Sequence, residues 1–286
     1  MQVPGDFAKR LIGSEGDGVR PWLDGLPDLA RWRCREWGLR IEGPPWHGHT
    51  ALVFPVRRDG ARAVLKLAWQ NDDTRDEPVA LSTWDGRGAV RLLESGHGTL
   101  LLERLDASRS LLTEPLDEAA GIASALLRRL TVPAPPLVRT LRAEAIRLAT
   151  ELPAEWARLG RPLPKRLLDA AVAVCRDLGP EAGSHLVNQD LHYENVLAGT
   201  REPWLVIDPQ PIAGDPEYGV IPLLWNRFGE STVEERFAAV TEGLDADRAR
   251  AWTLVRAVEN WLWAVKSGGF PSTPILAAIA ERVALE

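Results

Sequence analysis

Residues 188–209 read NQDLHYENVLAGTREPWLVIDP, and this stretch decides the fold that we expect. Asp190 and Asn195 enclose four residues, and the short apolar run 196–197 follows them. A turn then leads to a second apolar run, 204–207, which ends on Asp208. Short apolar runs separated by turn residues predict two strands of a hairpin. The pattern therefore returns a carboxylate to the end of a strand soon after an Asp/Asn pair.

Phosphoryl transfer needs a carboxylate that orients and deprotonates the attacking hydroxyl group. It also needs an amide and a second carboxylate that hold Mg²⁺ against the phosphates. Asp190, Asn195 and Asp208 offer these groups in that chain order. Alone, D-x-x-x-x-N is a weak signal, because Asp and Asn are ordinary loop residues. Its weight depends on partners elsewhere in the chain.

Lys66 is the first such partner. In the predicted strand 61–69, alternation places Val64 and Lys66 on one face and the leucines on the other. A lysine in mid-strand costs desolvation free energy unless it meets an anion, although an edge-strand lysine can reach solvent instead. Glu77, near the start of the predicted helix 77–86, is the candidate anion. A strand lysine paired with a helix glutamate holds the ATP phosphates in protein-kinase-like folds.

Composition limits the partners. The chain has 286 residues, 45% of them hydrophobic, which is enough for one large core or for two lobes. A formal charge of -6 favours neither nucleic acid nor an anionic membrane, whereas a cationic ligand is tolerated. No apolar run has transmembrane length and the start does not resemble a signal peptide, so we expect a cytoplasmic protein. No protein partner is indicated, and Cys34 and Cys175 have no disulfide or zinc spacing.

The periodicity changes along the chain. After a helix at 21–39, the first hundred residues read mainly as antiparallel strands, with turns at Asp59-Gly60 and Gly96-His97-Gly98 and one inserted helix at 77–86. From Leu116 onward the apolar spacing is helical. The predicted strands are 39–43, 49–58, 61–69, 89–95 and 98–106. The predicted later helices are 116–130, 136–160 and 164–179, with a Trp-rich helical region from about 217 to the end.

The run DLHYENVLAGTREPWLVIDPQPIAGDPEYG, residues 190–219, resembles the catalytic segment of the aminoglycoside phosphotransferases, within them the streptomycin 6-phosphotransferase and hydroxyurea-resistance kinase group. The tail 242–268 is similar as well. The resemblance implies an α+β, protein-kinase-like two-lobe fold with a small N-terminal antiparallel sheet lobe that carries one helix. Residues 1–105 would form this nucleotide-binding lobe, and 106–286 a larger, mainly helical catalytic and acceptor-binding lobe.

The resemblance also implies an activity and site residues. The activity is transfer of phosphate from ATP, with Mg²⁺, to an alcohol group of a small polar or cationic antibiotic, above all streptomycin, with resistance as the result. Asp190 would be the catalytic base, Asn195 and Asp208 the magnesium ligands, and Lys66 the phosphate lysine with Glu77 as its partner.

The adenine site would lie at the hinge LLLERLD, residues 100–106. There the carbonyl group of Glu103 and the amide of Leu105 would bond the adenine edge, and Val64 would cover its face. The segment Gly43 to Thr50 stands where a phosphate-covering loop belongs but does not spell G-x-G-x-x-G. Asn188 replaces the usual histidine two residues before the base; its amide could still bind the loop backbone.

Acids and aromatic residues suggest an acceptor site. A guanidinium or ammonium group on the acceptor would form strong charge-assisted bonds with carboxylates in a partly buried cleft. Ordinary solvated acids and helix-core tryptophans are the competing interpretation for each of these residues. The candidates are Asp215, Glu217, Glu259, Asn260 and Trp261.

Other functions stay open at this stage. His185, His192 and Glu194 suggest a metal hydrolase, but they form no H-E-x-x-H pattern. A non-catalytic nucleotide-binding module has no need of all four residues Lys66, Asp190, Asn195 and Asp208. The acceptor could also be hydroxyurea or another small metabolite, and neither ATP over GTP nor the oligomeric state can be read from the sequence.

Overall fold

The computed structural model describes residues 3–268 and 271–284 and divides into two compact units. Unit 1 comprises Met1–Gly86 and Val90–Leu105, and unit 2 comprises Arg87–Ala89 and Asp106–Glu286. Residues 87–89 belong to unit 2 because the backbone N–H of Val206 donates to the Gly88 carbonyl oxygen at 3.0 Å. The functions predicted for residues 1–105 and 106–286 stay predictions.

Unit 1 is built on an antiparallel sheet whose strands follow the order β1-β3-β4-β6-β5, with β2 also paired to β3. Asp59 and Gly60 join β3 to β4 with φ values of 48° and 83°, the left-handed pair that a tight type I′ hairpin requires. The predicted turn there is confirmed. The strands are β1 (Arg40–Ile41), β2 (Trp46–His47), β3 (Ala51–Arg58), β4 (Ala61–Ala68), β5 (Leu92–Gly96) and β6 (Thr99–Glu103).

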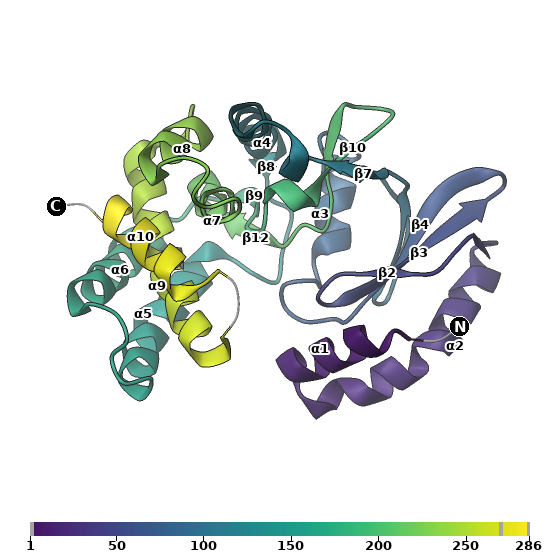
Figure 1. Ribbon diagram of the computed structural model, residues 1–286, viewed down its shortest axis with the longest axis horizontal. Coiled ribbons are helices and arrows are strands. Elements are labelled where there is room, and N and C mark those ends of the chain that lie inside the picture. The colour runs from purple at the N-terminus through teal and green to yellow at the C-terminus, as the bar shows by residue number, and fades with distance from the viewer. Residues whose placement is uncertain (1–2, 269–270, 285–286) are drawn as a thin grey trace. The chain divides into compact units, whose positions relative to one another are not determined.

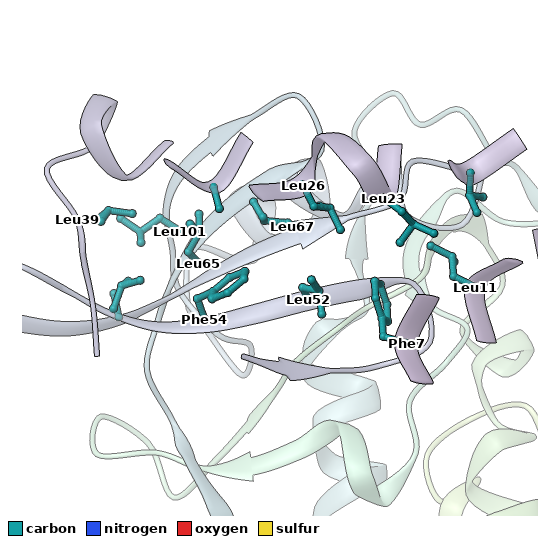
Figure 2. Packing of buried hydrophobic residues seen from close by; sticks show 14 residues of the cluster. Phe7, Leu11, Leu23, Leu26, Leu39, Leu52, Phe54, Leu65, Leu67 and Leu101 are labelled. Atoms are coloured by element: carbon teal, nitrogen blue, oxygen red, sulfur yellow. The ribbon is translucent and has the colours of Figure 1, made fainter. Parts of the chain in front are cut away.

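Three α-helices accompany this sheet: α1 (Gly5–Glu15), α2 (Arg20–Glu36) and α3 (Glu77–Trp84). Figure 2 shows Phe7 and Leu11 of α1 beside leucines of α2 and of the strands, forming one apolar cluster. The helix α1 was not predicted, because these two buried side chains are too few to reveal a period in a polar stretch. The helix α2 ends before Gly38, whose φ of 63° suits the position after a helix C-terminus.

Unit 2 contains the helices that Figure 1 shows from teal to yellow, and α9 packs against α5, α6 and α10. The predicted helix 116–130 is confirmed as α4. The predicted helix 136–160 begins only at Leu141, because the Thr140 side chain caps it by accepting from the Ala143 N–H. The helices are α4 (Leu116–Leu130), α5 (Leu141–Arg158), α6 (Lys165–Leu178), α7 (Pro222–Trp225), α8 (Val233–Val240), α9 (Ala246–Ser267) and α10 (Thr273–Val283).

Two small antiparallel sheets of unit 2 contain the strands of residues 188–209 and the strands on either side of them. The first has the strand order β11-β10-β7, and the second has the order β12-β9-β8. The hairpin β10–β11 was predicted, whereas β9 and β12 were not. The strands are β7 (Asp106–Ser110), β8 (Val132–Pro133), β9 (His185–Asn188), β10 (Val196–Ala198), β11 (Trp204–Val206) and β12 (Pro211–Gly214).

Short 3₁₀ turns complete the chain. They are η1 (Asp17–Val19), η2 (Leu111–Thr113), η3 (Gly179–Glu181), η4 (Tyr193–Asn195) and η5 (Pro216–Gly219). Within residues 3–268 and 271–284, none of the helices combines the length and the apolar character that a membrane span requires. Both cysteines are free thiols, Cys175 buried and Cys34 half-buried.

Candidate active site

The amine of Lys66 and the carboxylate of Glu77 form a buried ion pair within unit 1. Lys66 lies on β4, between β3 and β6, and is 4% exposed. Its Nζ donates to Glu77 Oε1 at 2.7 Å and to Oε2 at 2.6 Å, and Glu77 is the first residue of α3. The alternative of an edge-strand lysine in solvent is therefore wrong, because β4 is an interior strand. Burying two charges costs several kcal/mol of desolvation per ion, so such a pair needs good geometry to persist.

The predicted adenine contacts lie along the same face and at the end of the sheet. Val64 precedes Lys66 by two residues, so both side chains leave β4 on the face opposite Leu65 and Leu67. Glu103 ends β6, and its side chain accepts from the Arg91 N–H at 2.8 Å. Leu105 is the last residue of unit 1. Their contacts with adenine stay predictions.

The segment Gly43 to Thr50 contains a strand in place of a continuous loop. Trp46 and His47 form β2 and pair with β3, where Trp46 lies opposite Val53. The Gly48 N–H then donates to the Ala51 carbonyl oxygen at 3.1 Å and closes the turn. The segment thus reaches β3 through ordinary strand pairing, although it lacks the glycine pattern.

In unit 2, Asn188 organises the backbone around Asp190. Its Oδ1 accepts from the N–H of Asp190 at 3.1 Å and from the N–H of Gln210 at 3.1 Å. Asn188 ends β9 and is 5% exposed, so these bonds form away from water. The asparagine therefore supports the loop backbone, as expected for a residue in place of histidine.

Asp190 itself is half-buried, with 28% of its side chain exposed. Gln210 Nε2 donates to Asp190 Oδ2 at 3.2 Å, and His192 Nε2 lies 3.8 Å from the same oxygen. Gln210 was missed by sequence reasoning, because a single glutamine before a strand carries no signal of its own. Its position directly after Asp-Pro, beside the predicted strand end, is the only hint.

Asn195 and Asp208 lie at the open end of the β10–β11 hairpin. Val196 pairs with Val206, so the residues next to this pair face each other across the hairpin. The Ile207 N–H accordingly donates to the Asn195 carbonyl oxygen at 2.9 Å. Asn195 Nδ2 donates to the Asp190 carbonyl oxygen at 3.3 Å, which ties the hairpin to the loop of the predicted base.

Asp208 has an exposed side chain and a φ of +50°. A positive φ is uncommon outside glycine, and Asp and Asn tolerate it better than other residues do. The backbone reverses here, so that Gln210 returns to Asn188 and Asp190. Backbone and side-chain hydrogen bonds thus connect Asp190, Asn195 and the residues on either side of Asp208.

The donor set of this network suits Mg²⁺. Magnesium prefers oxygen ligands and is usually bound by one or two carboxylates together with substrate phosphates. Asn195 donates through its amide nitrogen, so the amide oxygen points to the other side, and Asp208 offers an exposed carboxylate. Within the described ranges, no group of three or more His, Cys, Asp and Glu side chains is arranged to hold a metal. A hydrolase site built on His185, His192 and Glu194 therefore has no support here.

Asp215, a predicted acceptor contact, has a buried side chain whose hydrogen bonds lie within unit 2. It is 4% exposed and accepts from the Gly183 N–H, from Arg248 Nε and from Trp252 Nε1, each at 2.7 Å. Trp252 is wholly buried. Since its two oxygens already receive three donors inside unit 2, the carboxylate is not placed to receive a cation from solution.

Glu217 has a similar structural position. It is 7% exposed and accepts from the N–H of Asp245 at 3.2 Å. Asp245 caps α9 by accepting from the N–H groups of Asp247 and Arg248. Burial raises the pKa of Glu217, against the hydrogen bonds from the backbone. Glu217 therefore supports the start of α9, and its contact with an acceptor stays a prediction.

The other three acceptor candidates lie on one turn of α9. Glu259 accepts from Arg147 Nη2 of α5 at 2.8 Å and keeps 26% of its side chain exposed. Burial raises the pKa of Glu259, and the nearby Glu144 carboxylate raises it further. Asn260 donates to the Arg256 carbonyl oxygen at 2.8 Å, and Trp261 is half-buried. These three residues keep access to solvent that Asp215 lacks.

Solved structures of similar fold are enzymes that phosphorylate small molecules. The crystal structure of aminoglycoside phosphotransferase APH(4)-Ia matches with a TM-score of 0.61 at 15% identity, over 90% of this chain and 98% of that one. Choline kinase LicA from Streptococcus pneumoniae matches with a TM-score of 0.58 at 12% identity, over 90% and 96% of the two chains. The fold is therefore that of the protein-kinase-like phosphotransferases, and the predicted fold class is confirmed.

Sequence comparison assigns the chain to a family. Residues 36–268 match the model described as "Aminoglycoside/hydroxyurea antibiotic resistance kinase". The hydroxyurea phosphotransferase of Kitasatospora aureofaciens is 43% identical over 98% of this chain and 85% of its own length. The streptomycin 6-kinase of Streptomyces griseus is 40% identical over 99% and 97%. The chain belongs to the aminoglycoside/hydroxyurea antibiotic resistance kinase family, as its resemblance predicted.

Proposed function

We propose that this kinase transfers the γ-phosphoryl group of ATP to a hydroxyl group of streptomycin, a small cationic antibiotic. The observation that carries the proposal is the network of unit 2, in which Asp190, Asn195 and the turn at Asp208 are tied together by backbone and amide hydrogen bonds. Streptomycin is the acceptor named for the Streptomyces griseus relative, which aligns over nearly the full length of both chains.

Asp190 would orient the acceptor hydroxyl group and take its proton. Positioned acid–base groups of this kind typically contribute a rate factor of about 10² to 10⁴. Gln210 holds one oxygen of the carboxylate, and Asn188 holds the backbone N–H of the same residue. These contacts fix the carboxylate before the acceptor arrives, which lowers the entropic cost of reaching the reactive geometry.

Asn195 and Asp208 would hold Mg²⁺. When bound, the ion would supply positive charge that stabilises the negative charge of the phosphate groups during transfer. The amide of Asn195 is oriented for this task by its bond to the Asp190 carbonyl group. The proposed base and the proposed metal ligands would thus belong to one hydrogen-bonded segment.

Lys66 would bind the α- and β-phosphates, with Glu77 keeping its amine in place. The carbonyl group of Glu103 and the amide of Leu105 would bond adenine, with Val64 against its face. A structure of APH(4)-Ia has been solved as a ternary complex with AMP-PNP and hygromycin B, which supports an adenine nucleotide as phosphate donor in this fold.

Glu259, Asn260 and Trp261 would contact the acceptor. The guanidinium groups of streptomycin can pair with a partly exposed carboxylate, and here Glu259 already pairs with the guanidinium group of Arg147. Hydroxyurea, named for the Kitasatospora aureofaciens relative, is a second candidate because that relative is 43% identical. Hydroxyurea is small and uncharged, so it would not depend on Glu259.

The test is a phosphorylation assay of the purified protein with ATP and Mg²⁺ against streptomycin, other aminoglycosides and hydroxyurea, with products identified by mass spectrometry. We expect one phosphoryl group to appear on streptomycin. The Glu259→Gln variant should have a raised KM for streptomycin only. Product from hydroxyurea alone would select the second candidate. Nucleotide binding without product from any acceptor would identify a non-catalytic module.

A further inference from the structure

Arg256, in the middle of α9, is a buried arginine that the functions above do not use. It is 9% exposed, and its guanidinium group lies over the ring of Tyr218 at 4.9 Å and over that of Trp225 at 5.9 Å. Its Nη1 donates to the Gln189 carbonyl oxygen at 2.8 Å and to the Tyr218 carbonyl oxygen at 3.4 Å. The stronger contact therefore ends on the residue that precedes Asp190.

The peptide group between Gln189 and Asp190 is held at both of its polar atoms. Arg256 binds its carbonyl oxygen, and Asn188 Oδ1 accepts from its N–H at 3.1 Å. Because a peptide group is planar, fixing both atoms fixes the orientation of the whole plane. The Gln189 N–H donates to the Gln210 carbonyl oxygen at 3.0 Å, which fixes the preceding peptide as well. On the other side of the Asp190 Cα atom, Asn195 Nδ2 donates to the Asp190 carbonyl oxygen at 3.3 Å, so both peptide groups that flank this atom are held and the direction of its side chain is restricted.

Burying the charged guanidinium group of Arg256 costs desolvation free energy, and a bond with only a structural role does not require a charged donor. An arginine stays protonated in a protein interior, so its burial requires nearby anions. Glu144 and Glu259 supply them: the Arg256 charge acts to lower the pKa of both carboxyl groups, against the effect of burial. Among the described residues, however, its hydrogen bonds go to carbonyl oxygens. A neutral donor or a water molecule would satisfy a carbonyl oxygen at lower desolvation cost.

We propose that Arg256 is a positioning residue, which holds the Gln189–Asp190 peptide so that the Asp190 carboxylate faces the acceptor hydroxyl group. The role of Asp190 in this inference rests on the proposed function. Arg256 then acts on the rate of phosphoryl transfer and leaves nucleotide binding alone. It also connects the acceptor helix α9 to the loop of the base, since Glu259 and Asn260 lie one turn further along the same helix.

The test compares Arg256→Met with Arg256→Lys and with a matched control, Arg236→Met. Arg236 is also a buried arginine, 4% exposed, and donates to the carbonyl oxygens of Asn226 at 2.6 Å and Arg227 at 3.0 Å. Methionine keeps much of the apolar volume and removes the donors. Both methionine variants should therefore lose similar thermal stability, which separates stability from catalysis.

In steady-state kinetics, Arg256→Met should lower kcat by about 10- to 100-fold at an unchanged KM for ATP, because small misplacements of a catalytic group have effects of this size. Arg256→Lys should recover part of the loss, since an ammonium group can donate to Gln189 but cannot stack on the rings as well. Arg236→Met should keep kcat within about twofold. A kcat of Arg256→Met as high as that of Arg236→Met would overturn the inference.

Hydrogen exchange gives a readout that needs no turnover. In Arg256→Met the amide hydrogens of Gln189, Asp190 and Gln210 should exchange faster than in the wild type, and in Arg236→Met they should not. Unchanged exchange at these amides would overturn the positioning role even if kcat fell. A wild type that phosphorylates no acceptor would contradict the proposed function, and the exchange experiment would still decide whether Arg256 fixes this peptide.

Discussion

Asp208 and Asp215 are two acids on neighbouring turns of unit 2, yet they have opposite environments. Asp208 is exposed and sits at a φ of +50° at the open end of a hairpin. Asp215 is 4% exposed, and three donors at 2.7 Å occupy its oxygens. Both stand in the segment that resembles the family, so sequence likeness does not separate them. The difference that the structure shows is one of burial: the Asp208 side chain is exposed to solvent, and the Asp215 side chain is enclosed by internal donors.

The largest effect that this comparison predicts is on turnover, at Asp190. Asp190→Asn should lower kcat by about 10²- to 10⁴-fold, because the amide cannot take the hydroxyl proton. The contact with Gln210 can persist through the amide oxygen, so ATP affinity and melting temperature should change little. Coupled-assay kinetics and nucleotide titration measure both. Unchanged turnover would remove Asp190 from the chemistry and place it with Asp215.

Lys66 and Glu77 combine the two kinds of environment, since they are buried and also predicted to meet a ligand. Lys66→Met should destabilise the fold by about 3–5 kcal/mol, because Glu77 loses the cation that compensates its buried charge. The double variant Lys66→Met with Glu77→Gln should regain most of this stability in urea denaturation. ATP binding should be lost in both variants. A double variant that binds ATP as well as the wild type would contradict the phosphate role of Lys66.

The Asp208→Asn variant tests the contribution of the negative charge of Asp208, because it changes little else. Asn tolerates a positive φ as Asp does, so Asp208→Asn should keep the melting temperature of the wild type. The magnesium-dependent part of AMP-PNP affinity should fall by at least about tenfold, since the proposed ligand keeps one oxygen but loses its negative charge. Calorimetric titration with Mg²⁺ and with EDTA measures this difference. Full magnesium dependence in the variant would remove Asp208 from the metal site.

The same substitution at position 215 should show the opposite result. Asp215→Asn places an amide N–H₂ either against the Gly183 N–H or against both Arg248 and Trp252, which should lower the free energy of unfolding by about 2–4 kcal/mol. The KM for the acceptor should not change in the folded protein. Asp169→Asn is the control, because its ion pair with Lys165 is exposed and should contribute at most about 1 kcal/mol. A stable Asp215→Asn variant with a raised acceptor KM would return Asp215 to the acceptor site.

The smallest effect is a pH dependence at Glu217. Burial raises its pKa in the folded state, so its protonated form contributes stability at low pH that is lost as pH rises through that raised value. Glu217→Gln keeps an acceptor for the Asp245 N–H and removes the charge. The variant should therefore melt slightly above the wild type at pH 7 and together with it at pH 4. A lower melting temperature of the variant at pH 7 would show that the charge itself is stabilising.

The features that sequence reasoning found are those with local causes. The helix 116–130 was predicted because its apolar spacing is uninterrupted, and the turn at Asp59-Gly60 because both residues accept a left-handed backbone. The Lys66–Glu77 pair was predicted because a lysine in mid-strand costs desolvation free energy unless it meets an anion. Each of these expectations depends on residues within about a dozen positions.

The missed features depend on contacts between distant residues. Gln210 and Arg256 are ordinary polar residues until the fold brings them to Asp190 and Gln189. The strands β9 and β12 each have four residues and pair with one another across the segment between them, which no local period reveals. Asp215 was assigned to the acceptor site because its burial could not be seen. The burial of each side chain in the folded protein could not be predicted from the sequence.

The register of the β10–β11 hairpin has a consequence for how this enzyme can change. Asn195 directly precedes Val196, and Asp208 follows Val206 by two residues, so the Val196–Val206 pairing brings both residues to the same end of the hairpin. Slipping one strand by a residue would turn every side chain on it to the other face. A change of register would therefore move one proposed ligand relative to the other. Residues of α9 such as Glu259 lie outside this pairing, so a substitution there would leave the register of the two proposed ligands unchanged.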